Sequence, residues 1–148
     1  MEIPADIQIL ASIKTGSVYY FEEESLSSDE PHYFVILNKN PRSEESLILV
    51  CASSQVDKRK EICRKLGFPP ETLVVISPTE YPLFIKPTII DCNRAFEKTA
   101  QSLIEKLKNK KLGVCIEMMP ENIIKKLIDG VLISSQITED VKEMLKRE

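Results

Sequence analysis

Three runs of apolar residues mark the first third of the chain, and each has the length of a short β-strand. They cover residues 17–21, 32–38 and 47–54, with a turn-forming segment between the second and the third. Neighbouring antiparallel strands place the start of one beside the end of the next. His32, the only histidine, opens the second run, and Ser53 closes the third. The pattern therefore predicts that these two side chains meet at one rim of a sheet.

The rest of the chain alternates between helical and strand patterns. A short helix is expected after Pro4, over residues 5–13, with its apolar side covering an open end of the sheet. Residues 55–66 have the period of a helix, and Gly67 is placed to end it. Further strands are expected over 73–76, 88–92 and 112–118, and further helices over 94–108, 120–128 and 138–146, with Asp129-Gly130 ending the helix over 120–128.

These elements predict one α+β domain over residues 1–148, built on a small, strongly bent antiparallel sheet or a barrel with inserted and C-terminal helices. At 148 residues and 43% hydrophobic content, the chain is large enough to bury a core of its own. The four cysteines have no close pair, which is typical of free thiols in a cytoplasmic protein. No apolar stretch approaches the roughly 20 residues that span a bilayer, so no membrane contact is expected.

The net charge of −3 argues against a protein that binds nucleic acid through its overall charge. Any such function has to rest on local patches. Acidic residues gather in the expected loop over 22–30, while basic residues form short runs at 58–60 and 108–111. Most such runs are solvated surface.

Several classes of site are excluded. With four glycines and no GxGxxG or GxxxxGK motif, the chain lacks the usual phosphate loops of nucleotide-binding folds. One histidine and dispersed carboxylates offer no metal-ligand pair, so neither a metal nor another cofactor is expected. No Gly-x-Ser-x-Gly elbow surrounds Ser53 or Ser54, and cysteines within apolar strands, such as Cys51, are typical of inert core thiols.

His32 is the strongest candidate for chemistry, although an ordinary surface histidine is the simpler interpretation. It follows a proline at the end of the acidic loop, and imidazole is the side chain that exchanges a proton near neutral pH. Nearby hydroxyls, amides and cations could stabilise the charge that develops on a phosphodiester. The candidate catalytic residues are His32 and Ser53, and the candidate substrate-binding residues are Asn38, Lys39, Arg42 and Ser54.

The order of the runs resembles the MazF/PemK family of toxin endoribonucleases, which have an SH3-like barrel. Gly16-Ser17-Val18 is similar to the family's first strand, the run from His32 to Asn38 to its second, and the run from Val50 to Ser54 to its third. Ile89-Ile90-Asp91-Cys92-Asn93 resembles a later strand, and Met119-Pro120-Glu121-Asn122 resembles the start of the terminal helix. The resemblance covers roughly residues 15–130.

The resemblance implies a toxin of a toxin–antitoxin pair that cleaves single-stranded RNA without a metal and leaves a 2′,3′-cyclic phosphate. It also implies a homodimer and an antitoxin-like protein partner. His32 stands where the family has its catalytic arginine, and Ser53 stands where it has its catalytic threonine. Serine keeps the hydroxyl, whereas histidine lacks arginine's permanent charge and bidentate grip on phosphate.

Two functions are therefore open. One is a metal-independent endoribonuclease with His32 and Ser53 at its centre. The other is a catalytically inactive module that uses the same fold to bind RNA or a protein partner. The missing arginine and the acidic loop over 22–30, which suits a cationic partner, favour the second.

Overall fold

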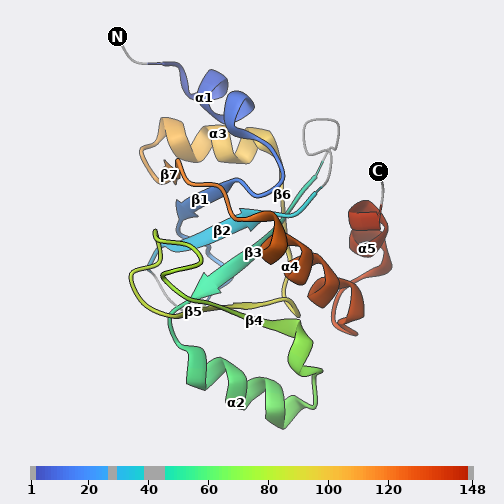
Figure 1. Ribbon diagram of the computed structural model, residues 1–148. Coiled ribbons are helices and arrows are strands. Elements are labelled where there is room, and N and C mark those ends of the chain that lie inside the picture. Colours follow the sequence, from blue (N-terminus) through green and yellow to red (C-terminus); the bar gives the residue numbers. More distant parts are fainter. Residues whose placement is uncertain (1–2, 27–29, 39–45, 147–148) are drawn as a thin grey trace.

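A computed structural model describes residues 3–26, 30–38 and 46–146. In this part of the chain the strands form one seven-stranded antiparallel sheet in the order β4-β5-β3-β2-β1-β7, with β6 paired to β3 (Figure 1). The strands are β1 (Val18–Phe21), β2 (His32–Ile36), β3 (Leu47–Ser53), β4 (Leu73–Ile76), β5 (Thr88–Asp91), β6 (Phe96–Lys98) and β7 (Leu112–Val114). The predicted α+β class and the antiparallel sheet are confirmed, but the sheet is open and does not close into a barrel.

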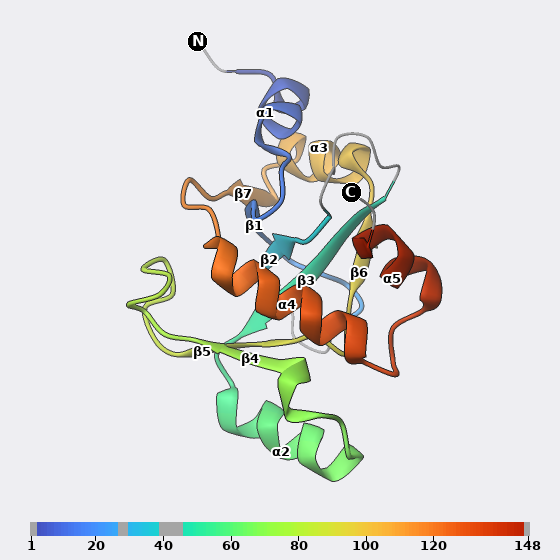
Figure 2. The same ribbon diagram turned by 45° about the vertical axis from the view of Figure 1, so that its right-hand side comes forward.

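Five α-helices and one short 3-10 turn lie on the two faces and the rims of this sheet within the described residues (Figure 2). They are α1 (Ala5–Ser12), α2 (Val56–Leu66), η1 (Pro70–Thr72), α3 (Ala100–Lys108), α4 (Glu121–Ile133) and α5 (Glu139–Lys146). Among them, none has the combination of length and apolar content that crossing a membrane requires.

The three apolar runs of the sequence become β1, β2 and β3, and they are apolar throughout because both faces of the sheet are covered. Successive side chains of a strand point to opposite faces. Phe34 and Leu49 belong to a core shared with α1 and α3, whereas Val35 and Val50 belong to a second core shared with α4 and α5. The predicted N-terminal helix is present as α1, and its Ile9 is fully buried in the first core. It packs mainly on α3, however, and Ile7 and Leu10 are exposed, so its apolar side does not cover an open end of the sheet as expected.

β3 pairs along one edge with two strands in succession. Leu49 lies opposite Phe96 of β6, and Ala52 lies opposite Ile90 of β5. Between these two pairs, β3 advances by three residues (49 to 52) while the segment that pairs with it advances by six (90 to 96). The additional residues form a turn over 91–95. This insertion interrupts the pairing along this edge of β3, as bulges do locally.

Buried hydrogen bonds hold the 91–95 turn in place. Asn93 is 6% exposed, and both its backbone N–H and its Nδ2 donate to Oδ1 of Asp91 at 2.9 Å. Nδ2 also lies 2.8 Å from Oγ1 of Thr72 in η1. Ser134, after α4, donates its hydroxyl to Oδ1 of Asn93 at 2.7 Å. Three separate elements therefore converge on one buried amide, which gives the turn a single conformation.

The predicted helix over 94–108 is wrong in its first third. Phe96 to Lys98 form β6, and the helix begins at Ala100 with Thr99 as its N-cap, whose Oγ1 accepts the N–H of Ser102 at 3.0 Å. Phe96 satisfies the helical spacing of the apolar stripe, but it packs in the first core from a strand. Strand pairing with β3 outweighs the local period here.

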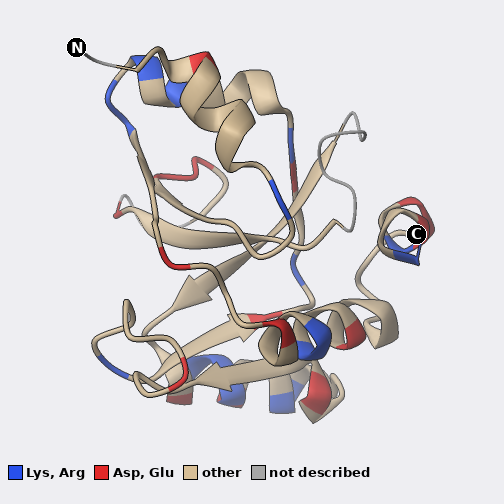
Figure 3. Ribbon diagram, turned by 45° about the horizontal axis from the view of Figure 1, so that its top comes forward, with Lys and Arg blue, Asp and Glu red and all other residues tan. Residues whose placement is uncertain are grey.

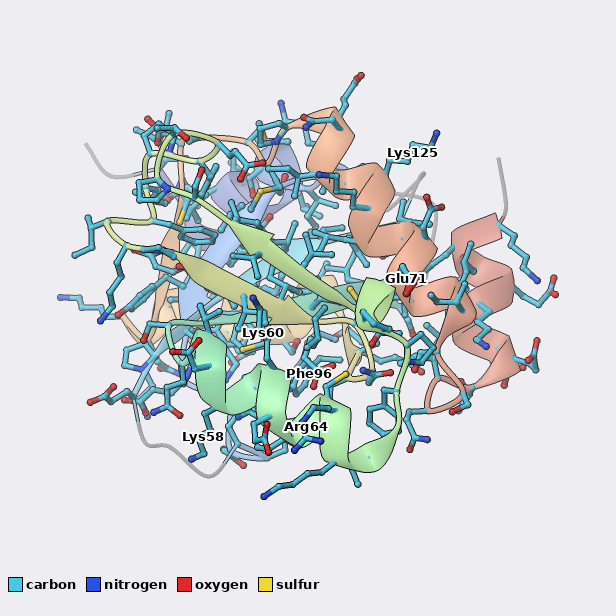
Figure 4. The ribbon with its side chains drawn as sticks, turned by 60° about the horizontal axis from the view of Figure 1, so that its bottom comes forward. Lys58, Lys60, Arg64, Glu71, Phe96 and Lys125 are labelled. Atoms are coloured by element: carbon cyan, nitrogen blue, oxygen red, sulfur yellow. The ribbon has the colours of Figure 1, made fainter. Side chains whose placement is uncertain are left out.

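The predicted break at Asp129-Gly130 is also wrong, because α4 runs through it to Ile133. Gly130 lies where the helix touches its neighbours. A Cβ added there would lie 2.9 Å from the carbonyl oxygen of Glu71 and 3.0 Å from Cβ and Sγ of Cys92. Figure 4 shows Glu71 beside α4. Glycine at this position therefore permits α4 to approach Glu71 and Cys92 closely, and it does not end the helix.

α2 follows β3 directly and projects from the rim of the sheet (Figure 2). Gly67 ends it with a φ of 74°, and the N–H of Gly67 donates to the carbonyl of Arg64 at 3.2 Å, as the sequence predicts. Of the apolar face expected for this helix, Cys63 is buried while Leu66 is 60% exposed. α2 thus packs against the rest of the protein along one narrow side, with Cys63, near its C-terminal end, as its buried residue.

Candidate functional site

His32 and Ser53 line the same pocket at the rim where β2 begins and β3 ends. Phe34–Cys51 is the last pair in the antiparallel register of β2 and β3, and His32 and Ser53 each lie two residues nearer the rim, on the same side of the sheet. The pocket has a volume of about 50 Å³. One water needs roughly 10–15 Å³ on the same measure, so a small anion such as a phosphate group fits. The structure therefore brings the two candidate catalytic residues together.

Two arginines complete this rim pocket, and neither was among the candidates from the sequence. Arg59 reaches it from the first turn of α2, and Arg94 reaches it from the 91–95 turn. Within the described residues neither guanidinium forms an ion pair, and that of Arg94 lies 5.6 Å from the centre of the Phe96 ring. Asp91 also lines the pocket, but its Oδ1 accepts both hydrogen bonds from Asn93. Two permanent cations thus face His32 and Ser53.

The imidazole of His32 is oriented by the backbone. Its Nδ1 lies 2.9 Å from the carbonyl oxygen of Glu30, two residues earlier. A carbonyl oxygen only accepts hydrogen bonds, so Nδ1 carries the proton and donates it. In the neutral ring Nε2 is then the acceptor, which is the state that a general base needs.

The hydroxyl of Ser53 is also directed by its surroundings. Its Oγ accepts the backbone N–H of Gln55 at 3.2 Å, in the turn that leads from β3 into α2. With an oxygen lone pair used in this way, the O–H hydrogen is left to donate to another group. Ser53 therefore suits the role of a donor to an anion in the rim pocket.

Cys51 is the nearest thiol to this site, since it lines the rim pocket beside His32. Burial raises the pKa of the Cys51 thiol to about 12, although the charges of Arg94 and Arg59 act in the opposite direction. The thiolate is the nucleophilic form of cysteine. Cys51 is therefore a neutral thiol near pH 7, and a Cys–His pair is not the chemistry of this pocket.

A second and larger pocket of about 430 Å³ shares His32, Ser53 and Arg59 with the first. It lies on the opposite face of the sheet, because its lining includes Tyr33 and Ala52, the residues that alternate with His32 and Ser53 along the strands. Its lining also includes aromatic and cationic side chains, beside aliphatic residues and the carboxylate of Glu30: Tyr20, Phe84, Lys58, Lys86, Leu83 and Ile85. We call it the aromatic pocket. The rim residues therefore stand where the two pockets meet.

The basic residues of α2 differ in whether they reach the aromatic pocket. Lys58 and Arg59 line the aromatic pocket, whereas Lys60 and Arg64 of the same helix do not. Figure 4 shows Lys58, Lys60 and Arg64 projecting from α2 in different directions. Arg64 instead pairs with Glu61 at 2.5 Å on the exposed side. Only the first turn of this helix contributes cations to the site.

The candidate substrate-binding residues are scattered. Ser54 lines the aromatic pocket, beside Ser53. Asn38 is fully buried beyond the far end of β2, where its Oδ1 accepts the N–H of Ile48 at 2.5 Å and its Nδ2 donates to Ser46 at 3.0 Å. It links the far end of β2 to the start of β3 and lies away from His32, so the structure does not bring it to the site. Lys39 and Arg42 lie outside the described residues.

The acidic loop is less repulsive toward an anion than its sequence indicates, because Glu23 is paired. Its Oε1 lies 2.6 Å from Nζ of Lys98, and its Oε2 accepts the hydroxyl of Ser25 at 2.7 Å. Burial raises the pKa of the Glu23 carboxyl, but the bonds from Lys98 and Ser25 outweigh it, so the net shift is downward. The pair also joins the loop to β6, and Leu26 of that loop lines the rim pocket.

Replacing Glu23 with glutamine should lower the free energy of unfolding at pH 7 by about 1–3 kcal/mol, because Lys98 is left half-buried without a counter-charge. A carboxyl whose pKa is lower in the folded state stabilises the fold above its unfolded pKa, near 4. That contribution is lost as the pH falls through the lower folded value. Urea unfolding of parent and Glu23→Gln at several pH values should show curves that converge on acidification.

Glu61→Gln is the matched control, since the Glu61–Arg64 pair has similar geometry on an exposed surface. It should leave stability almost unchanged. Equal effects of Glu23→Gln and Glu61→Gln, or a Glu23 effect that persists in acid, would show that the buried pair does not stabilise the loop.

No protein-family model matches the chain, and no curated protein sequence matches it. Among the residues that the structure describes, no three His, Cys, Asp or Glu side chains are grouped so as to hold a metal ion.

Proposed function

We propose that the protein cleaves single-stranded RNA at the rim pocket, with the 2′-hydroxyl of the substrate as nucleophile. The observation that carries this proposal is that His32, Ser53, Arg59 and Arg94 line one pocket of phosphate size. A base, a hydroxyl donor and two cations are the groups that this reaction needs around the scissile phosphate.

In the proposed reaction Nε2 of His32 takes the proton of the 2′-hydroxyl, whose oxygen then attacks the adjacent phosphorus. The bond from phosphorus to the 5′ oxygen breaks, and that oxygen leaves with a proton from solvent. The products are a 2′,3′-cyclic phosphate and a 5′-hydroxyl, and His32 returns its proton to water. Arg59 and Arg94 offset the extra negative charge on the phosphorus oxygens, and Ser53 donates a hydrogen bond to one of them.

The two arginines answer the main objection to the MazF/PemK resemblance, namely that histidine replaces arginine at position 32. A permanent cation is still available at the same rim, but α2 and the 91–95 turn supply it in place of β2. The guanidinium of either arginine can bind two phosphate oxygens at once. This support is independent of the net charge of the whole chain.

The test is to incubate the purified protein with mixed single-stranded RNA in EDTA and to identify the ends of any products. The parent should cleave, leaving cyclic phosphate ends. His32→Ala should cleave about 100- to 10,000-fold more slowly, as expected for a lost general base. Ser53→Ala should also be slower, and Lys60→Ala, which alters a cation of α2 outside both pockets, should match the parent.

Absence of cleavage by the parent across a range of pH and salt would refute the enzymatic proposal. Tight RNA binding without cleavage would assign the same pockets to a binding module, the alternative function. An unchanged rate for His32→Ala would show that another group is the base.

A further inference from the structure

A third pocket, of about 420 Å³, lies next to the aromatic pocket. The two share Tyr20 and Pro31, just as the aromatic pocket and the rim pocket share His32, Ser53 and Arg59. The third pocket lies along β7, and its cations are Lys110 and Lys111. The three pockets are therefore neighbours in a series from the 91–95 turn to the start of β7, and we call this series the track.

The track is basic although the protein is acidic. Its lining contains six Lys or Arg residues (Lys58, Arg59, Lys86, Arg94, Lys110 and Lys111) and three Asp or Glu residues (Glu22, Glu30 and Asp91). That difference gives the lining a charge of +3, while the whole chain carries −3. Lys and Arg positions are spread over several elements and not gathered in one segment (Figure 3). A path with this charge attracts a polyanion and suits no cationic partner.

Aromatic rings lie in the middle of the track. Tyr20 and Tyr33 meet edge to face with ring centres 4.5 Å apart, and Tyr33 is 5.4 Å from Phe84. Both tyrosines are partly exposed and line the aromatic pocket. Aromatic faces flanked by cations are typical of proteins that bind unpaired nucleic acid, because bases stack on the rings while phosphates meet the charges.

The lysines at the far end are held in place by the backbone. The N–H of Lys110 donates to the carbonyl of Leu107 at 3.0 Å, and the N–H of Lys111 donates to that of Lys106 at 2.8 Å. Both side chains are exposed, and within the described residues neither is in an ion pair. The pair is therefore anchored and available to phosphate.

We propose that an RNA strand bound at the rim pocket continues through the aromatic pocket and that its distal phosphates bind Lys110 and Lys111. The inference rests on the proposed function for its ligand class, and it adds that the substrate is a single strand several nucleotides long. Bases lie against Tyr20 and Tyr33, and the strand bends around the rim from one face of the sheet to the other.

The test measures binding of fluorescent 2′-O-methyl RNA, which lacks the 2′-hydroxyl nucleophile, by anisotropy. Strands of about 3 and about 12 nucleotides span the range from a rim ligand to a full track. The K110Q/K111Q variant should bind the longer strand about ten-fold more weakly and the shorter strand like the parent. Its affinity for the longer strand should also fall less steeply with salt, because fewer counterions are released.

K125Q/K126Q is the matched control, since Lys125 and Lys126 are adjacent, exposed lysines of α4 that line none of the three pockets. This variant should bind both strands like the parent. Unchanged binding of the longer strand by K110Q/K111Q, or equal weakening for both lengths, would overturn the track. So would an oligoglutamate that binds as tightly as the longer RNA. The 2′-O-methyl strands cannot be cleaved, so this test measures binding independently of activity. If the parent binds them in the expected pattern but does not cleave unmodified RNA, the proposed reaction is refuted and the proposed binding along the track is not.

Discussion

Replacing Arg94 with alanine should slow RNA cleavage by about 100-fold or more while leaving the fold intact. Its guanidinium faces the rim pocket and, among the described residues, is in no ion pair, so its charge is directed at the site. Removing one preorganised donor to a developing oxyanion commonly costs a factor of about 100–1,000 in rate. Arg94→Lys should recover part of the rate, since lysine keeps the charge and loses the planar fork. Single-turnover cleavage measures both variants.

Arg64→Ala is the control for this experiment, because Arg64 is an exposed arginine that pairs with Glu61 and lines no pocket of the track. It should cleave at the parental rate. If Arg94→Ala and Arg64→Ala lose activity equally, the effect comes from overall charge. If neither loses activity, the cation that supports cleavage lies elsewhere.

Gly130→Ala should destabilise the protein by about 1–3 kcal/mol, the usual cost of overpacking a tight contact. Helix propensity alone predicts the opposite, a gain of about 1 kcal/mol for alanine over glycine within a helix. The contact decides the sign here, because the new Cβ meets the backbone oxygen of Glu71 at 2.9 Å and Cys92 at 3.0 Å. Gly130→Val adds two further methyl groups at the same contact and should cost more than about 3 kcal/mol. Thermal and urea unfolding measure both.

Asp129→Ala tests the same helix one residue earlier, at an exposed position. It should change stability by no more than about 0.5 kcal/mol. A stabilising Gly130→Ala would mean that α4 does not approach the 70–72 and 91–95 segments closely, and the turn that carries Arg94 would lose part of its stated support.

The strands were predictable from the sequence where local pattern and long-range contact agree. The runs over 17–21, 32–38 and 47–54 are apolar because two cores cover them, and they become β1 to β3. The helix expected from Arg94 failed because Phe96 fits both a helical stripe and a strand, and only pairing with β3 decides between them. Gly130 was misread for a similar reason, since a glycine needed for close approach looks the same in a sequence as one that ends a helix.

His32 and Ser53 could be placed together from strand pairing alone, whereas the contribution of Arg59 and Arg94 depends on tertiary structure. Adjacent antiparallel runs were enough to place His32 near Ser53. Arg59 stands in a run of three basic residues, and the sequence does not show which of them reaches the site. The orientation of α2 about its axis decides this, because Arg59 lines both pockets and the adjacent Lys60 lines neither. Arg94 depends on a turn fixed by Asn93 and its buried partners, and the spacing Asp91-Cys92-Asn93 was the available signal for such a turn.

In the proposed function, the rim of β2 and β3 is one binding site for the phosphates of a single RNA strand. NMR titration of isotope-labelled protein with 2′-O-methyl RNA can locate this site, because each backbone amide reports its own surroundings. Saturable shifts are expected at His32, at 53–55, at Arg59 and over 91–94, with further shifts at Lys110 and Lys111 for longer strands. Shifts that gather on α4 and α5, or no saturable shifts at all, would contradict it.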